Sequence, residues 1–152
     1  MFYEVKIKRT CIVEENSSYG IIKESYLVGA VNYTDVESSV ARYMNREHPG
    51  DDYNIQKISK SKVDDLIMKG LAEGEERLET YYKVRCAYME DIDGHTKKRK
   101  VIALVNAADV EKASSMALTN YDPEKTLHYE VVKVEKTSIV GVIDMCDENF
   151  ES

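Results

Sequence analysis

A repeated stretch decides the fold: residues 53–61 read YNIQKISKS, and residues 129–137 read YEVVKVEKT. Both stretches begin with tyrosine and carry lysine at their fifth and eighth positions. Two earlier blocks are repeated in the same order, since Tyr3–Ile7 matches Tyr82–Cys86 and Asn32–Glu37 matches Asn106–Glu111. Because the order is kept and the offset changes only by short insertions, the chain contains a tandem internal repeat.

Each copy has the pattern of a β-hairpin followed by a helix and a third strand. Apolar and polar residues alternate in two stretches joined by a polar loop, which is typical of a hairpin. The hairpin strands are expected at residues 2–13 and 21–31 in the first copy and at 81–89 and 100–105 in the second. The loops fall at 14–20 and 90–98, and the second loop contains Asp93-Gly94, a pair favoured in tight turns.

A helix is expected between the hairpin and the third strand of each copy. In the first copy Thr34 and Glu37 have the spacing of a capping box. In the second copy Asp109 begins the helix. Apolar residues at helical spacing form one face of each helix: Val36, Val40, Tyr43 and Met44 in the first, and Val110, Ala113 and Ala117 in the second.

These elements predict an α+β fold of tandem ββαβ repeats with a mostly antiparallel sheet. The first repeat spans 1–68, a Glu- and Gly-rich linker spans 69–80, the second repeat spans 81–143, and an acidic tail spans 144–152. A short apolar segment closes each repeat, with Val63, Leu66 and Ile67 in the first and Ile139, Val142 and Ile143 in the second. Each repeat is too small to bury a core well, so the two are expected to pack around a pseudo-twofold axis.

The overall charge excludes one class of function. The chain has 152 residues, with 21 Lys and Arg against 28 Asp and Glu, which gives a net charge of −7. This is the wrong sign for a protein that coats duplex DNA through a basic surface. The first residues alternate in polarity, which is unlike a signal peptide, and no apolar run is long enough to span a membrane. A cytoplasmic protein without a membrane partner is expected.

No motif for catalysis, metal binding or cofactor binding is present. The three cysteines, Cys11, Cys86 and Cys146, are widely spaced, and the three histidines form no ligand pair. Phosphate-loop, dinucleotide and nucleophile-elbow motifs are absent from the sequence. The sequence therefore predicts a protein that is not an enzyme and needs no cofactor or metal.

A basic run beside tyrosines is the first candidate site. It consists of Lys97, Lys98, Arg99 and Lys100, with Tyr82 and Tyr88 expected on the partner strand. Single-stranded nucleic acid is bound by basic side chains, which contact its phosphates, together with aromatic rings, which stack on its nucleobases. The alternative is a solubilising hairpin edge, because lysines on an edge strand discourage aggregation.

The acidic tail is the second candidate site. Residues 144–152 carry four acidic side chains and no basic one, with a single aromatic residue near the end. Asp147, Glu148, Phe150 and Glu151 are the candidate partner-docking residues. The tail resembles those of bacterial and phage single-strand-binding proteins, although two residues follow the phenylalanine here. The alternative is a frayed acidic terminus.

Taken whole, the chain resembles a domain-of-unknown-function family from gut anaerobes and their phages. The resemblance rests on residues 2–6, on Tyr26-Leu27-Val28 leading to residues 33–37, on residues 55–60 and on residues 81–84, and it extends to about Asp144. Such a family transfers no catalytic residue. It implies a phage or mobile-element protein in the bacterial cytoplasm that acts as a binder.

Three kinds of binding function remain open. The leading hypothesis is an accessory protein that binds a host or phage protein, and it predicts a contiguous exposed apolar or acidic patch. The first alternative is a single-stranded DNA-binding protein of a replication or recombination module. The second alternative is a protein that binds or sequesters a small ligand such as a nucleotide. Self-association into an oligomer through an exposed sheet edge or helix face is also expected.

Overall fold

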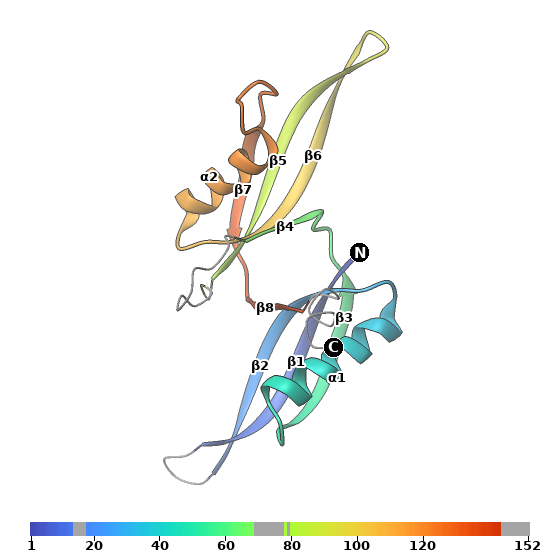
Figure 1. Ribbon diagram of the computed structural model, residues 1–152, viewed down its shortest axis with the longest axis vertical. Helices are drawn as coiled ribbons and strands as arrows, with labels where there is room; N and C mark the ends of the chain where they lie inside the picture. The colour runs from blue at the N-terminus through green and yellow to red at the C-terminus, as the bar shows by residue number, and fades with distance from the viewer. Residues whose placement is uncertain (14–17, 69–77, 79, 144–152) are drawn as a thin grey trace. The chain divides into compact units, whose positions relative to one another are not determined.

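The computed structural model describes residues 1–13, 18–68, 78 and 80–143. It contains eight strands and two helices in that part of the chain (Figure 1). They divide into two compact units: unit 1 comprises Met1–Ser61 and Ser138–Ser152, and unit 2 comprises Lys62–Thr137. The elements are β1 (Phe2–Val13), β2 (Ser18–Gly29), α1 (Tyr33–Glu47), β3 (Asp52–Lys60), β4 (Asp65–Ile67), β5 (Tyr81–Ile92), β6 (His95–Asn106), α2 (Val110–Tyr121), β7 (Glu130–Lys136) and β8 (Ile139–Ile143).

Each unit holds one four-stranded sheet, and the two sheets have the same plan. The order is β3-β1-β2-β8 in unit 1 and β7-β5-β6-β4 in unit 2. A long antiparallel hairpin forms the centre of each sheet, and the third strand joins it antiparallel at one edge. The short fourth strand joins the other edge in parallel. The predicted α+β fold with mostly antiparallel sheet is confirmed, and the shared plan is compatible with the repeat.

The hairpin of unit 2 is longer than the sequence pattern indicated. Residues 90–98 were expected to form a loop, but β5 and β6 stay paired as far as Ile92 and His95. Only Asp93 and Gly94 form the turn, with φ angles of 50° and 79°. Two positive φ angles are the signature of a type I′ turn, whose twist matches that of the strands, so polar side chains did not end the pairing here.

The helix starts agree with the sequence in unit 2 but not in unit 1. Asp109 caps α2, and its carboxylate accepts a hydrogen bond from the backbone N–H of Lys112 at 2.7 Å. The prediction of Thr34 as the cap of α1 was wrong, because Asn32 occupies that position and accepts from the N–H of Asp35 at 2.9 Å. The carboxylate of Asp35 in turn accepts from the N–H of Val31 at 3.0 Å. Asn32 and Asp35 thus satisfy the N–H groups of Asp35 and Val31, whereas a capping box of Thr34 and Glu37 would have satisfied those of Glu37 and Thr34.

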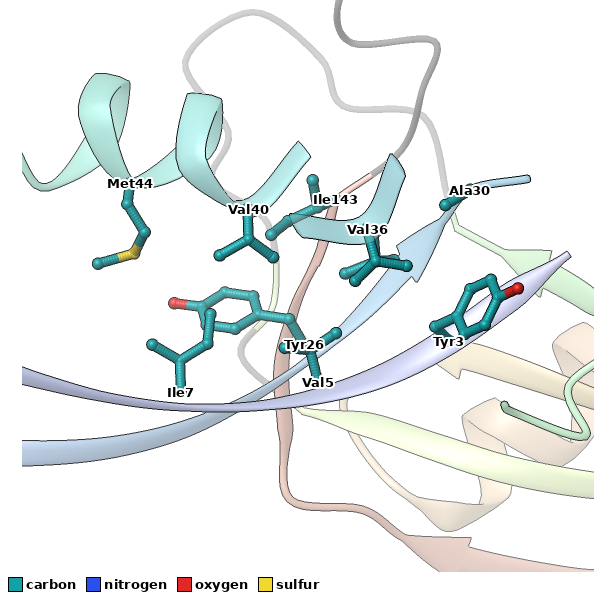
Figure 2. Close-up of a cluster of buried hydrophobic side chains, with 10 residues drawn as sticks. Tyr3, Val5, Ile7, Tyr26, Ala30, Val36, Val40, Met44 and Ile143 are labelled. Atoms are coloured by element: carbon teal, nitrogen blue, oxygen red, sulfur yellow. The ribbon is translucent and has the colours of Figure 1, made fainter. Parts of the chain in front are cut away.

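Each unit has its core between its helix and one face of its sheet. In unit 1 the helix residues Val36, Val40 and Met44 pack on strand residues that include Val5 and Tyr26 (Figure 2). In unit 2 the small Ala113 and Ala117 take the helix positions of the core. Val110 was expected on that face but is 49% exposed, because it is the first residue of the helix and precedes the buried turn.

The short fourth strands do not stay with the repeat that precedes them in sequence. Segment 63–67 closes the first repeat, yet β4 pairs with β6 of unit 2. Segment 139–143 closes the second repeat, yet β8 pairs with β2 of unit 1. Each of the sequence segments 1–68 and 81–143 therefore contributes its last strand to the sheet of the other compact unit, and the compact units differ from these segments for this reason.

Candidate nucleic-acid interface

Each sheet has one face covered by its helix and one face directed away from it, here called the open face, on which Leu27 of β2 and Leu104 of β6 are nevertheless buried. Side chains alternate between the two faces along a strand. In β1 the residues Tyr3, Val5 and Ile7 belong to the helix-side core, so the even-numbered neighbours lie on the open face. In β5 the residues Tyr82, Val84 and Cys86 belong to the core, so the odd-numbered neighbours lie on the open face.

The alternation divides the basic run between the two faces of the unit 2 sheet. Val101 packs against the helix-side core, which places Arg99 and Lys97 on the helix side. Lys98 and Lys100 therefore lie on the open face. All four side chains are exposed, but the structure does not bring them together as a single patch.

The two tyrosines of the basic-run hypothesis lie on the helix side. Tyr82 is only 7% exposed and is part of the core, so its ring offers no face to a nucleobase. Tyr88 lies opposite Arg99, and its ring centroid is 4.5 Å from that of Tyr129. The ring of Tyr129 also stacks on Tyr121 at 5.5 Å. These contacts hold the Tyr88 ring within a protein cluster.

Part of the basic run is already paired with acidic residues. The Nε of Arg99 donates to Oε2 of Glu90 at 2.7 Å, and both side chains are more than a third exposed. The Nζ of Lys98 lies 3.8 Å from Oε1 of Glu130. Exposed pairs of this kind contribute little to stability, ~0–1 kcal/mol each.

The open face of the unit 2 sheet gathers basic residues from three strands. This basic face of sheet 2 consists of Lys83, Arg85, Lys98, Lys100 and Lys133. Arg85 lies directly opposite Lys133 in the β5–β7 pairing. Glu135 lies on the same face and pairs with Lys133 at 2.6 Å. Lys133, with smaller contributions from Arg85 and Lys83, lowers the pKa of the Glu135 carboxyl.

The open face of the unit 1 sheet carries a matching group. This basic face of sheet 1 consists of Lys6, Lys8, Lys23 and Lys57. Lys6 lies directly opposite Lys57 in the β1–β3 pairing, and Lys8 lies directly opposite Lys23 in the β1–β2 pairing. The pair Lys6–Lys57 thus corresponds to Arg85–Lys133 of unit 2. A protein with net charge −7 places like-charged pairs on the open faces of both sheets.

Sequence reasoning missed the basic faces because their residues are spaced, not consecutive. Lys6 and Lys8 lie two positions apart, as do Lys83 and Arg85. Two-residue spacing on a strand is the signal that places side chains on one face. The four consecutive basic residues 97–100 are instead divided between the two faces of the sheet.

The cysteines and the acidic tail are the other features that the sequence brought forward. Cys11 is half-buried and Cys86 is buried, both as free thiols, and burial raises the pKa of the Cys86 thiol. In the described part of the chain, no cluster of His, Cys, Asp or Glu could hold a metal ion. Within those same ranges, neither helix has the length and apolar character needed to cross a membrane. Asp147, Glu148, Phe150 and Glu151 of the tail lie outside the described residues.

A cavity of about 650 Å³ lies at the end of α2, in unit 2. Asp122, Pro123, Lys125, His128 and Tyr129 are among the residues that line it. Lys125 and His128 adopt positive φ angles of 58° and 56°, which are uncommon for residues with a side chain. The Asp122 carboxylate holds the loop by accepting hydrogen bonds from its backbone N–H groups.

The comparisons with known proteins place the chain in a family. Residues 1–145 match the family described as Domain of unknown function (DUF4494). No curated protein and no solved structure matches the chain. With nearly its whole length covered by that match, the chain belongs to the DUF4494 family of domains of unknown function.

Proposed function

We propose that the chain is a non-enzymatic binding protein that holds single-stranded nucleic acid on the basic faces of its two sheets. The like-charged pairs carry this proposal, because Lys6–Lys57 and Arg85–Lys133 occur at corresponding positions of both sheets. Like charges directly opposite each other destabilise a sheet, by analogy with the ~0.2–1 kcal/mol scale of cross-strand pairs. Glu135 already offsets part of the repulsion between Arg85 and Lys133. A bound phosphate backbone would neutralise the remainder and the repulsion between Lys6 and Lys57.

Protection of sheet edges does not account for these residues. Lysine on an edge strand prevents edge-to-edge pairing, and this explains Lys57 in β3 and Lys133 in β7. Lys6 and Arg85, however, lie in β1 and β5, which have a neighbouring strand on each side. A basic residue on an inner strand contributes nothing to protection of an edge, which favours the binding explanation.

The proposed contacts are made to phosphate and not to bases. Tyr82 and Tyr88 lie on the helix side, so the rings expected to stack on bases are not part of the basic faces. Binding through phosphates alone depends strongly on salt and only weakly on sequence. We therefore expect little discrimination among oligonucleotides of equal length.

Anisotropy of a labelled single-stranded oligonucleotide, titrated with the full chain at several salt concentrations, tests this function. The double variant Lys57→Gln/Lys133→Gln removes one basic side chain from each basic face. A matched control is Lys60→Gln/Lys136→Gln, because these exposed lysines lie on the same strands but oppose Tyr3 and Tyr82 on the helix side. The first variant should weaken binding and reduce the slope of log K against log salt by about 1.4, or ~0.7 for each lost contact.

The same variants give a readout that separates binding from folding. Lys57→Gln relieves the repulsion with Lys6, so its free energy of unfolding should stay equal or rise while its affinity falls. Weaker binding caused by poor folding would lower both quantities. Equal affinity of the two double variants, or no binding by the unsubstituted chain at low salt, would contradict the proposal.

A protein partner is the second candidate function, favoured by exposed apolar residues where both helices begin. Val31 is 67% exposed, Tyr33 47% and Val110 49%. Tyr33 and Val110 are each the first residue of their helix. The double variant Tyr33→Ser/Val110→Ser should abolish capture of one defined partner from a lysate of the host cell and leave oligonucleotide binding unchanged. Loss of oligonucleotide binding as well would contradict a separate protein surface.

The biological setting belongs to the same proposal. We infer a phage or mobile-element accessory protein that acts in the cytoplasm of a bacterium. The support is the resemblance of the sequence to a family from gut anaerobes and their phages. Detection of the protein in the cytosolic fraction of a cell that carries the element would test this setting.

A further inference from the structure

The two basic faces share their charges but differ in the residues around them. Lys6 and Arg85 correspond, since each is opposed by a lysine of the edge strand just before a shift in register. On the neighbouring hairpin strand, Ser25 lies opposite Lys6, whereas Ile102 lies opposite Arg85. At the register shift, β3 carries Gln56 as its extra residue, whereas β7 carries Val132. Polar groups in unit 1 thus correspond to apolar groups in unit 2.

The polar residues of unit 1 surround a hollow of about 380 Å³. It is lined by Lys6, Ile7, Lys23, Glu24, Ser25, Gln56 and Ser138. The register shift in β3 lies at Gln56, and a second shift in the pairing of β2 with β8 lies between Ser25 and Tyr26. Bulges of this kind re-aim side chains and are enriched beside functional sites.

The lining has the chemistry of an oxyanion site. Lys6 and Lys23 supply ammonium groups, Ser25 and Ser138 supply hydroxyls, and Gln56 supplies a carboxamide. All three kinds of group donate hydrogen bonds to a phosphate oxygen. The one acidic residue of the lining is Glu24, and its Oε1 accepts from Nε of Arg9 at 2.7 Å, which offsets its charge.

We propose that this hollow is a phosphate subsite, which fixes one phosphate group of the nucleic acid that sheet 1 binds, whereas sheet 2 binds phosphate by charge alone. The subsite rests on the proposed nucleic-acid function for its ligand. The shared chemistry is a phosphate group, and its source is either a backbone phosphodiester or a terminal phosphate. A strand with a 5′ phosphate and one without it distinguish these sources.

The direct test is a titration of the ¹⁵N-labelled full chain with inorganic phosphate, in which the chemical shifts of the backbone amides are monitored by NMR. The amides of Lys23, Ser25 and Gln56 should shift with saturation, whereas the amides of the corresponding Lys100, Ile102 and Val132 should not. The double variant Ser25→Ala/Gln56→Leu should weaken phosphate binding at least tenfold. Ser59→Ala is the matched control, because Ser59 lies on the open face of β3 but outside the hollow.

The outcomes separate the subsite from the proposed function. The subsite is overturned, and the proposed function stands, if the chain binds the oligonucleotide but phosphate induces no amide shifts and the double variant does not change phosphate binding. Phosphate-induced shifts in the hollow without oligonucleotide binding support a phosphate site and overturn the function. Gln56→Leu alone keeps the test valid if Ser25→Ala impairs folding, since Gln56 is exposed. Shifts of equal size in both sheets would overturn the distinction between the units.

Discussion

The substitution Gly141→Ala tests the exchange of the last strands, which is the least expected feature of the fold. Gly141 of β8 pairs with Tyr26 of β2. A Cβ added at Gly141 would lie 3.2 Å from Cε1 and 3.3 Å from Cδ1 of the Tyr26 ring. Carbon atoms prefer ~3.5–4.0 Å, so the ring would have to move by a few tenths of an ångström. Tyr26 is 2% exposed and its ring packs edge-on against Tyr43 at 5.2 Å, which limits that movement.

Overpacking of this kind lowers the free energy of unfolding by ~1–3 kcal/mol. For a chain of this length the melting temperature should fall by ~2–4 °C for each kcal/mol. Urea unfolding, monitored by circular dichroism, measures the change in unfolding free energy. Val140→Ala is the control because Val140 lies in the same strand and is 46% exposed. The clash exists only if β8 lies beside β2. A loss for Gly141→Ala no larger than that for Val140→Ala would refute the exchange of β8.

Three further predictions concern unit 2. Tyr121→Phe removes the hydrogen bond that the Tyr121 hydroxyl donates to Oδ2 of Asp65 at 2.6 Å, and should lower the unfolding free energy by ~1 kcal/mol. In a double-mutant cycle it should add nothing to Asp65→Ala, which removes the acceptor. Burial opposes ionisation of Asp122, but hydrogen bonds from backbone N–H groups of the following loop outweigh it and lower the pKa of the carboxyl group. The ionised carboxylate therefore contributes its full stability above the unfolded pKa of ~3.9, and this stability is lost as the pH falls through the lower folded pKa. The difference in urea midpoint between the unsubstituted chain and Asp122→Asn should accordingly shrink as the pH is lowered from about 5 to below the folded pKa. Gly94→Ala has open space for its Cβ but a φ of 79°, so it should lower the unfolding free energy by ~1 kcal/mol through backbone conformation alone, and an unchanged urea midpoint would count against the type I′ turn.

The local elements could be predicted because their signals lie within a few residues. Alternation over the long hairpin strands and the apolar face Val36, Val40 and Met44 were both legible in the sequence, and the structure buries that helix face. The cap of α1 was predicted wrongly because Asn32, Thr34 and Asp35 all have side chains that accept hydrogen bonds from helix N–H groups. Which one caps the helix depends on where the preceding strand leaves the sheet.

The partners of the short strands could not be predicted from their own residues. Leu66 and Ile67 of β4 and Val142 and Ile143 of β8 are apolar segments that either sheet could accept. In unit 2 the choice is fixed by specific polar contacts: the N–H of Asp64 donates to the carbonyl of Ile102 at 2.8 Å, and the Asp64 carboxylate accepts from the N–H of Ile102 at 2.8 Å. Such contacts between segments far apart in sequence leave no periodic signal.

The candidate site shows the same division between local and non-local information. The run Lys97–Lys100 is conspicuous as a sequence, but adjacency on a strand separates side chains onto opposite faces. The pairs Lys6–Lys57 and Arg85–Lys133 join residues about 50 positions apart, so their like-charged opposition exists only in the register of the sheet. Because such opposition weakens a sheet, it is better evidence of a binding surface than the number of basic residues. The overall charge of −7 excludes only the extended basic surface that duplex DNA requires, and it is compatible with the local binding of a polyanion that we propose.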